Sequence, residues 1–239
     1  MIINAHNFPS GDVDLLTGLQ WYWDLNTAGA TETDQHNGLV LSKSGTVNVS
    51  SGGAPDGADC IDVGSAAGYY RNASVARTID TEAGFSVNIW GYSTADSATA
   101  NCIFNHRGSS ASQTHWQINI RDSSSTDRAI TRDAVPVVRT ASASEASANA
   151  WHMYTLVDDA TSLRLYVDGS LVATDATALG TRDSAAREMA IGAAAWSAGS
   201  AALRHNGRIS MAGVWGIALD TTQISALYNS GAGKRYAAL

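Results

Sequence analysis

Lysine is nearly absent from this chain of 239 residues, which carries it only as Lys43 and Lys234. The formal net charge at pH 7 is −7, and the sequence has no basic stripe. Contacts with phosphates need clustered cations, so we expect neither nucleic acid nor an anionic membrane surface as a partner. No apolar run approaches the roughly 20 residues that cross a bilayer, so no transmembrane helix is predicted.

Cysteine is equally scarce, with Cys60 and Cys102 in strand-like surroundings. The first ten residues lack the charged n-region and the apolar h-region of a secretory signal. We therefore expect a protein that is made and kept in the cytoplasm of its host, where thiols stay reduced. Two buried free thiols are the favoured prediction, and a single disulfide is the alternative.

The stretch from Trp151 to Thr174 predicts a β-meander. Asp168-Gly169 is a two-residue hairpin signal, because both positions of a type I′ turn need a positive φ. Counting from this turn places Tyr166 opposite Leu171 and Leu165 opposite Val172, and one apolar face would hold Leu163, Leu165, Val167 and Val172. Such a sheet needs a second layer to cover its apolar face.

The same stretch resembles a known family. A strand that opens Trp151-His152, a short acidic turn, and Leu163-Arg-Leu-Tyr-Val-Asp-Gly169 are similar to the laminin-G-like, concanavalin A-like lectin/glucanase family. Further blocks follow in that family's order, namely Trp21–Leu25, Asp34–Leu39, Gly84–Trp90, Asn206–Ile209 and Ile224–Asn229. The resemblance covers residues 19 to 231. It implies an all-β fold, a two-sheet antiparallel jelly-roll sandwich with a short C-terminal helix.

The resemblance also suggests the domain organisation, with residues 1–18 as an N-terminal arm and residues 19–239 as one sandwich domain. Asp220 and Gln223 form a capping-box pattern at the start of the C-terminal helix, and Gly231 is the predicted stop. Residues 141–150 are rich in Ser and Ala, so we interpret them as a connector that builds no core.

Glycan hydrolysis is the enzymatic activity that this resemblance raises, and it requires two carboxyl groups that flank one bond. In glycanases of the family, these carboxyl groups come from one strand with the pattern Glu-x-Asp-x-Glu or Glu-x-Asp-x-x-Glu. None of the four glutamates has such neighbours: Glu32, Glu82, Glu145 and Glu188. A Gly-x-Ser-x-Gly elbow, a phosphate-binding loop and paired zinc-ligand spacings are also missing. We therefore expect the protein not to be an enzyme.

Calcium is a separate question, because the family often binds Ca²⁺ through carboxylates. One version of that site resembles an acidic pair after the closing Gly-Arg-Ile, where this chain has Ser210-Met211. These two side chains lack anionic oxygens, so no cofactor is predicted and the metal content is unknown. Four other carboxylates could still bind calcium elsewhere, namely Asp34, Asp158, Asp159 and Asp168. The favoured interpretation is that they are solvated side chains in turns.

Aromatic side chains are the second kind of binding candidate, since sugars stack on exposed rings. Six tryptophans fall in predicted strands and are assigned to the core or a sheet face: Trp21, Trp23, Trp90, Trp116, Trp151 and Trp215. Trp196 instead lies in a small-residue loop, with Arg204 and His205 nearby. We predict these three as ligand or interface residues, and packing of Trp196 back onto the sheet is the alternative.

The function we expect is that of a non-enzymatic virion structural protein. The neutral surface rich in Ser, Ala and Gly and the ending Leu227–Gly233 resemble phage-borne members of the family. The predicted role is a bacteriophage capsid decoration or cement protein, which implies the virion as location and the major capsid protein or other virion proteins as partners. The alternative is a carbohydrate-binding module in host attachment, with glycans as partners, and a glycanase ranks behind both. Homo-oligomerisation is left open.

Overall fold

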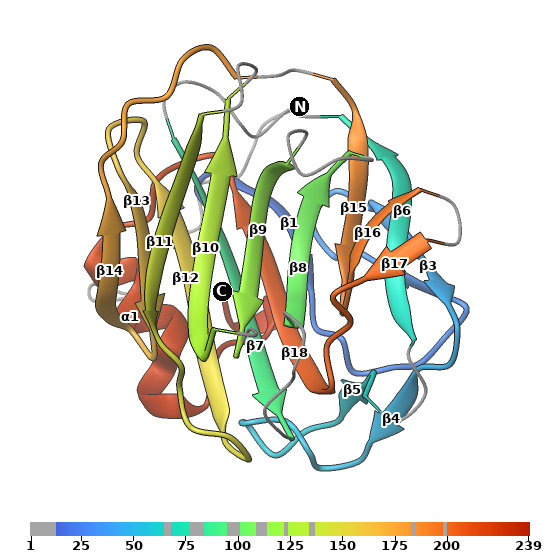
Figure 1. The fold of residues 1–239 in the computed structure, drawn as a ribbon. Helices are drawn as coiled ribbons and strands as arrows, with labels where there is room; N and C mark the ends of the chain where they lie inside the picture. Colours follow the sequence, from blue (N-terminus) through green and yellow to red (C-terminus); the bar gives the residue numbers. More distant parts are fainter. Residues whose placement is uncertain are drawn as a thin grey trace, which may run out of the picture.

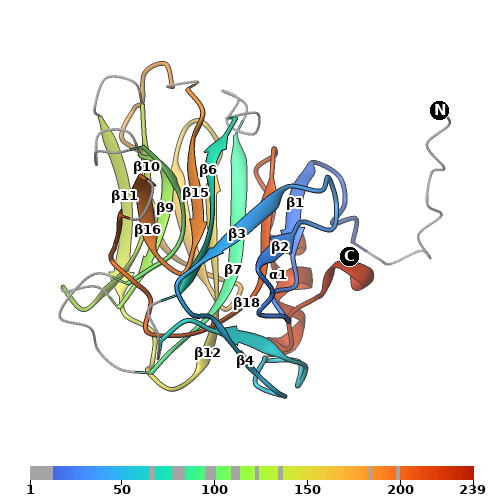
Figure 2. The same ribbon diagram turned by 90° about the vertical axis from the view of Figure 1, so that its right-hand side faces the viewer.

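A β-sandwich forms the body of the molecule in the computed structural model. The structure describes residues 13–64, 68–76, 84–94, 101–108, 114–121, 124–133, 137–182, 185–197 and 200–239. Of residues 195–197 and 200, it describes the backbone and not the side chains. Two antiparallel sheets of eight strands face each other across an apolar interior (Figures 1 and 2). The predicted all-β, two-sheet sandwich is therefore confirmed. In the described part of the chain, no helix is long and apolar enough to cross a membrane.

The back sheet, which lies behind in Figure 1, has the strand order β14-β13-β12-β7-β18-β5-β4, with β1 paired to β18. Its strands are β1 (Leu19–Trp23), β4 (Asn48–Ser50), β5 (Cys60–Asp62), β7 (Phe85–Ser93), β12 (Trp151–Asp158), β13 (Leu163–Val167), β14 (Ser170–Asp175) and β18 (Gly207–Trp215).

The front sheet faces the viewer in Figure 1 and has the order β11-β10-β9-β8-β15-β6-β3-β2. Its strands are β2 (Thr31–Thr33), β3 (Val40–Ser44), β6 (Tyr69–Val75), β8 (Asn101–Arg107), β9 (Thr114–Ile120), β10 (Thr126–Arg132), β11 (Val138–Ser144) and β15 (Arg187–Ile191). A separate hairpin pairs β16 (Ala194–Ser197) with β17 (Ser200–Ala202).

The inner faces of the two sheets supply the main core. Side chains alternate across a strand, so β7 sends Phe85, Val87 and Ile89 inward, and β9 sends Trp116 and Ile118 to meet them. All five are fully buried. Burial of each such side chain contributes about 1.5–3 kcal/mol, which makes the contact between the sheets the main source of stability. Cys60 and Cys102 are buried free thiols, as predicted.

A second apolar layer covers the outer face of the back sheet. Figure 2 shows α1 (Thr221–Tyr228) lying against this face, followed by the short 3-10 helices Asn229–Gly231 and Tyr236–Ala238. The predicted capping box is present. The side chain of Asp220 accepts from the N–H of Gln223, and the side-chain oxygen of Gln223 accepts from the N–H of Asp220. The helix ends earlier than predicted, because Asn229 already adopts a left-handed conformation (φ 49°).

The β13–β14 hairpin confirms the predicted turn and corrects its register. Asp168 and Gly169 have φ values of 51° and 78°, as the type I′ signal requires. Tyr166 pairs with Leu171 as expected, but a bulge follows and Leu165 pairs with Ala173. The extra residue in β14 turns Val172 outward, where it is 42 % exposed, so its predicted core position is wrong.

The Ser/Ala-rich segment 141–150 was expected to build no core, and this is wrong for its first part. Residues up to Ser144 belong to β11, and the side chain of Ala141 is buried between the sheets. Residues 145–150 form the connection to β12.

Asp158 joins the two sheets through a buried ion cluster, so the expected solvated turn is wrong at this position. Its Oδ1 lies 3.1 Å from Nη1 of Arg139 in the front sheet, and its Oδ2 lies 2.8 Å from Nη2 of Arg182. Thr131 donates to the same carboxylate at 3.0 Å. Asp158 is fully buried, so its carboxylate takes the place of water as the partner of these two guanidinium groups.

We predict that Asp158→Asn lowers the free energy of unfolding by about 3–5 kcal/mol, because it leaves buried arginines without their carboxylate. The matched control is Asp159→Asn, which removes a neighbouring carboxylate that is 29 % exposed and paired with Arg164. For the control we expect a loss of about 1 kcal/mol or less. Urea denaturation of both variants measures the difference, and equal losses would show that the buried ion cluster contributes no more to stability than the Asp159–Arg164 pair.

Candidate functional site

A row of five side chains crosses the outer face of the back sheet, starting from β4 and β5, which Figure 1 shows at the lower end of the sandwich. Trp151 in β12 is the pairing partner of Tyr92 in β7, and Tyr92 is in turn the partner of Arg208 in β18. Arg208 pairs with Asp62 in β5, and Asp62 pairs with Asn48 in β4. Directly paired residues lie on the same face, so these side chains form one cross-strand row.

The aromatic half of the row is held in a fixed arrangement. The rings of Tyr92 and Trp151 lie 5.7 Å apart at 58°, and the guanidinium carbon of Arg208 lies 3.9 Å from the centre of the Tyr92 ring. The indole Nε1 of Trp151 donates to the carbonyl oxygen of Gly53 at 2.7 Å. A Cβ at Gly53 would lie 2.4 Å from Oγ of Ser50 and 3.1 Å from Nη1 of Arg208, so a larger residue there would have to displace these side chains.

The row combines the groups that bind saccharides in proteins. Trp151, Tyr92, Arg208 and Asp62 are half-buried, and Asn48 is exposed. Aromatic rings offer flat apolar surface to the C–H face of a sugar, and the neighbouring charged and amide groups can exchange hydrogen bonds with its hydroxyls. We define these five residues as the candidate binding site. Sequence reasoning missed it, because its members are spread over residues 48 to 208 and only the strand register brings them together.

The three binding residues predicted from sequence lie elsewhere. Trp196 is in β16, and its side chain is outside the described part of the structure. Arg204 is half-buried, with its guanidinium carbon 5.4 Å from the centre of the Tyr69 ring on the outer side of the front sheet. His205 is 2 % exposed, and burial lowers its pKa to about 4. A ligand or interface role for this group stays a prediction.

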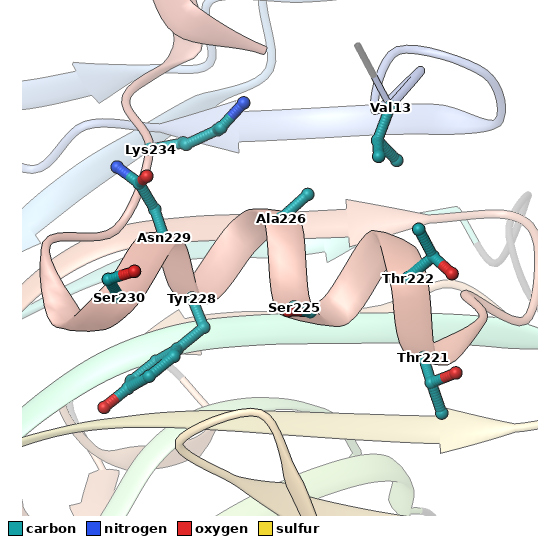
Figure 3. A pocket seen from close by; sticks show the side chains of 9 residues that line it. All are labelled: Val13, Thr221, Thr222, Ser225, Ala226, Tyr228, Asn229, Ser230 and Lys234. Carbon is teal, nitrogen blue, oxygen red and sulfur yellow. The ribbon is translucent and has the colours of Figure 1, made fainter. Parts of the chain in front are cut away.

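A broad hollow lies beside α1, with a volume of about 730 Å³ (Figure 3). Its lining is rich in hydroxyl groups and includes one of the two lysines: Val13, Thr221, Thr222, Ser225, Ala226, Tyr228, Asn229, Ser230 and Lys234. In Figure 3, Thr222, Asn229 and Lys234 point toward one side of the helix and Tyr228 toward the other. The ring of Tyr228 stacks on Trp90, with 5.8 Å between the ring centres, so one face of this ring is covered.

The carboxylates considered for calcium are used by the chain itself. Asp34 is 2 % exposed and accepts from the backbone N–H groups of Tyr22, His36, Asn37 and Leu39, so it is not the solvated side chain that was expected. Asp158 is held by arginines, as described above. Within the described residues, no three His, Cys, Asp or Glu side chains are placed to hold a metal ion together.

The described glutamates are likewise engaged one by one. Glu188 forms an ion pair with Arg71 at 2.7 Å, and Glu145 forms one with Arg121 at 3.2 Å. Glu32 accepts from Thr27, and burial raises the pKa of its carboxyl group. These side chains are thus tied to separate partners and do not offer the two facing carboxyl groups of a glycosidase.

Comparison with solved structures finds the same sandwich in larger proteins. A structure of botulinum neurotoxin type C, reported to interact with two ganglioside molecules, matches with a TM-score of 0.63 and 14% identity over 89% of this chain and 51% of that one. The serotype D ligand binding domain, solved with N-acetylneuraminic acid, matches with a TM-score of 0.58 and 12% identity over 89% and 51%. Trypanosoma rangeli sialidase matches with 0.61 and 10% over 91% and 33%.

These likenesses show the fold, and the chain spans about half the length of the neurotoxin chains and a third of the sialidase chain. No curated protein matches the sequence. A family model described as the concanavalin A-like lectin/glucanases superfamily matches residues 65–225, which include β6 to β18 and the first half of α1. With most of its length matched by that model, the chain belongs to the concanavalin A-like lectin/glucanase superfamily.

Proposed function

We propose that this protein is a glycan-binding domain that does not hydrolyse glycosidic bonds, and that the cross-strand row is its binding site. The observation that carries this proposal is the register that places Trp151, Tyr92, Arg208, Asp62 and Asn48 side by side. Aromatic surface next to a cation, a carboxylate and an amide is the chemistry that a polyhydroxylated ring requires. The gangliosides and N-acetylneuraminic acid named with the similar structures suggest which glycans to test first.

We propose the absence of glycosidase activity because the described carboxylates are not arranged as a catalytic pair. Described glutamates lie in separate ion pairs or hydrogen bonds, and the row itself contains a single carboxylate, Asp62. Oδ1 of Asp62 already accepts from the N–H of Gly64 at 2.9 Å. Cleavage of a glycosidic bond needs an acid on one side and a base or nucleophile on the other. A lone, hydrogen-bonded carboxylate is suited to orienting a sugar hydroxyl.

We predict that Tyr92→Ala weakens glycan affinity by about tenfold, because stacking contacts contribute roughly 0.5–1.5 kcal/mol beyond the buried area. The ligand is chosen from an array of neutral and sialylated oligosaccharides, and the affinity is measured by titration calorimetry. Tyr228→Ala is the matched control, since this tyrosine is also half-buried and also packs against an indole on the outer face of the same sheet.

The control should keep the affinity of the unmodified protein, with thermal melting used to verify that both variants fold. Loss of binding in Tyr228→Ala alone would place the sugar in the hollow beside α1 and reject the cross-strand row. If neither neutral nor sialylated oligosaccharides bind to the folded protein, the proposed function itself is rejected.

We further propose that the domain works on a bacteriophage particle, as a capsid decoration protein or in host attachment. This part rests on the resemblance of Leu227–Gly233 to phage-borne members of the family and on the neutral surface. Density-gradient fractionation of source lysate, with quantitative mass spectrometry, should recover the chain with DNA-filled particles. A copy number near that of the major shell subunit supports decoration, and a few copies per particle support attachment. Recovery only as free protein would refute both roles.

A further inference from the structure

Three side chains form a hydrogen-bonded chain at the start of β12, close to the cross-strand row but separate from it. Oγ of Ser147 lies 3.0 Å from Nε2 of His152, and Nδ1 of the same imidazole lies 2.6 Å from Oδ2 of Asp168. The serine is exposed, whereas the histidine and the aspartate are half-buried. A nucleophile, a base and a carboxylate in this order and at these distances have the geometry of a serine hydrolase triad.

The surrounding fold fixes the base and its carboxylate. Asp168 occupies the tight turn between β13 and β14, where its N–H donates to the carbonyl of Met153 and its Oδ1 accepts from the N–H of Met153. Its second oxygen is thereby aimed at His152, the second residue of β12, which is the strand paired with β13. The two residues are 16 apart in sequence, and the hairpin rather than a local motif brings them together.

We propose that Ser147, His152 and Asp168 form a site that hydrolyses short acyl esters, an activity beyond the proposed glycan binding. The chemistry of the triad selects acyl transfer. The exposed position of Ser147 favours short acyl groups, because a serine on an open surface has no enclosing apolar pocket that would hold a long acyl chain. Acetyl esters are the simplest substrates that such a site accepts.

The reaction balances with water as the only co-reactant. His152 takes the proton of Ser147 while Oγ attacks the acyl carbon, and the bond to the alcohol breaks as the imidazolium returns that proton to the leaving oxygen. Water, deprotonated by His152, then attacks the acyl carbon, the bond from that carbon to Oγ breaks, and the imidazolium returns the proton to Oγ of Ser147 as the carboxylic acid leaves. The N–H groups of Ser147 and Ala148 make no hydrogen bond within the described residues, so they are the candidate donors to the oxyanion.

The charges around His152 favour its protonated form. Asp168 from the hairpin and Asp127 from β10 raise the pKa of the imidazole, while burial opposes them. Arg121 acts on the same Asp127 and is paired with Glu145 at 3.2 Å, and the ring of Tyr154 lies 6.4 Å from the imidazole. The carbonyl oxygen of Ser147 lies 3.2 Å from Nε2 and stabilises the imidazolium as well. Only the neutral imidazole accepts the serine proton, so the rate should rise as the pH passes through this raised pKa.

The test is hydrolysis of p-nitrophenyl acetate by the full chain, together with labelling by a fluorophosphonate probe and peptide mapping of the adduct. We expect the label on Ser147 and a loss of about a hundredfold or more in rate for Ser147→Ala and His152→Gln. Ser142→Ala is the matched control, because Ser142 is an exposed serine of β11 with no histidine beside it in the described structure. It should keep the full rate and the label.

Asp168 is a positioning residue, and its role is read from the pH profile. Asp168→Asn keeps a side chain that suits the left-handed turn, but it removes the charge that raises the pKa of His152. The midpoint of the pH–rate curve should therefore move to lower pH. The proposal is overturned if the folded protein takes no label, if Ser147→Ala hydrolyses the ester at the original rate, or if the midpoint is the same in Asp168→Asn. Glycan binding by Ser147→Ala, measured separately, is expected to be unchanged.

Discussion

The apolar contact between the inner faces of the two sheets is the constraint on which the other features of this molecule depend. It commits alternate residues of every central strand to the interior, as Phe85, Val87 and Ile89 are committed in β7. The intervening residues must then face outward, where α1 covers part of the back sheet and leaves the lower end to Tyr92 and Trp151. Binding chemistry is therefore confined to strand ends, outer faces and connections.

Both proposed sites follow from that confinement. Trp151 and His152 are neighbours in β12 and point to opposite faces, so one strand end contributes to the cross-strand row and to the serine–histidine–aspartate chain. The row lies on a rigid sheet, which suits recognition of a ligand. Ser147 lies on the connection just before the strand, which suits a nucleophile that must be reached from solvent.

The sequence predicted those parts of the fold that depend on local chemistry. Asp168-Gly169 identified its turn and Asp220 with Gln223 identified the helix start, because a positive φ and a capping box leave strong local signals. The bulge in β14 leaves no such signal, and it moved Val172 from the expected core to the surface.

Features that need a partner far along the chain were beyond sequence reasoning. Asp158 is indistinguishable in sequence from its half-buried neighbour Asp159, and only Arg139 and Arg182 from other elements make it a fully buried charge. The cross-strand row is a product of register alone, since β12, β7, β18, β5 and β4 are adjacent in the sheet and not in the chain. The sequence therefore places Trp151 in the core or on a sheet face, but it does not show which side chains lie beside it.

The central claim is that glycans bind on the cross-strand row. Its most direct test is a crystal structure of the protein soaked with the oligosaccharide that binds most tightly on an array. The account predicts a sugar ring against Tyr92 and Trp151, with its hydroxyls in hydrogen bonds to Arg208 and Asp62. A saccharide in the hollow beside α1, or on the front sheet beside Arg204, would contradict it.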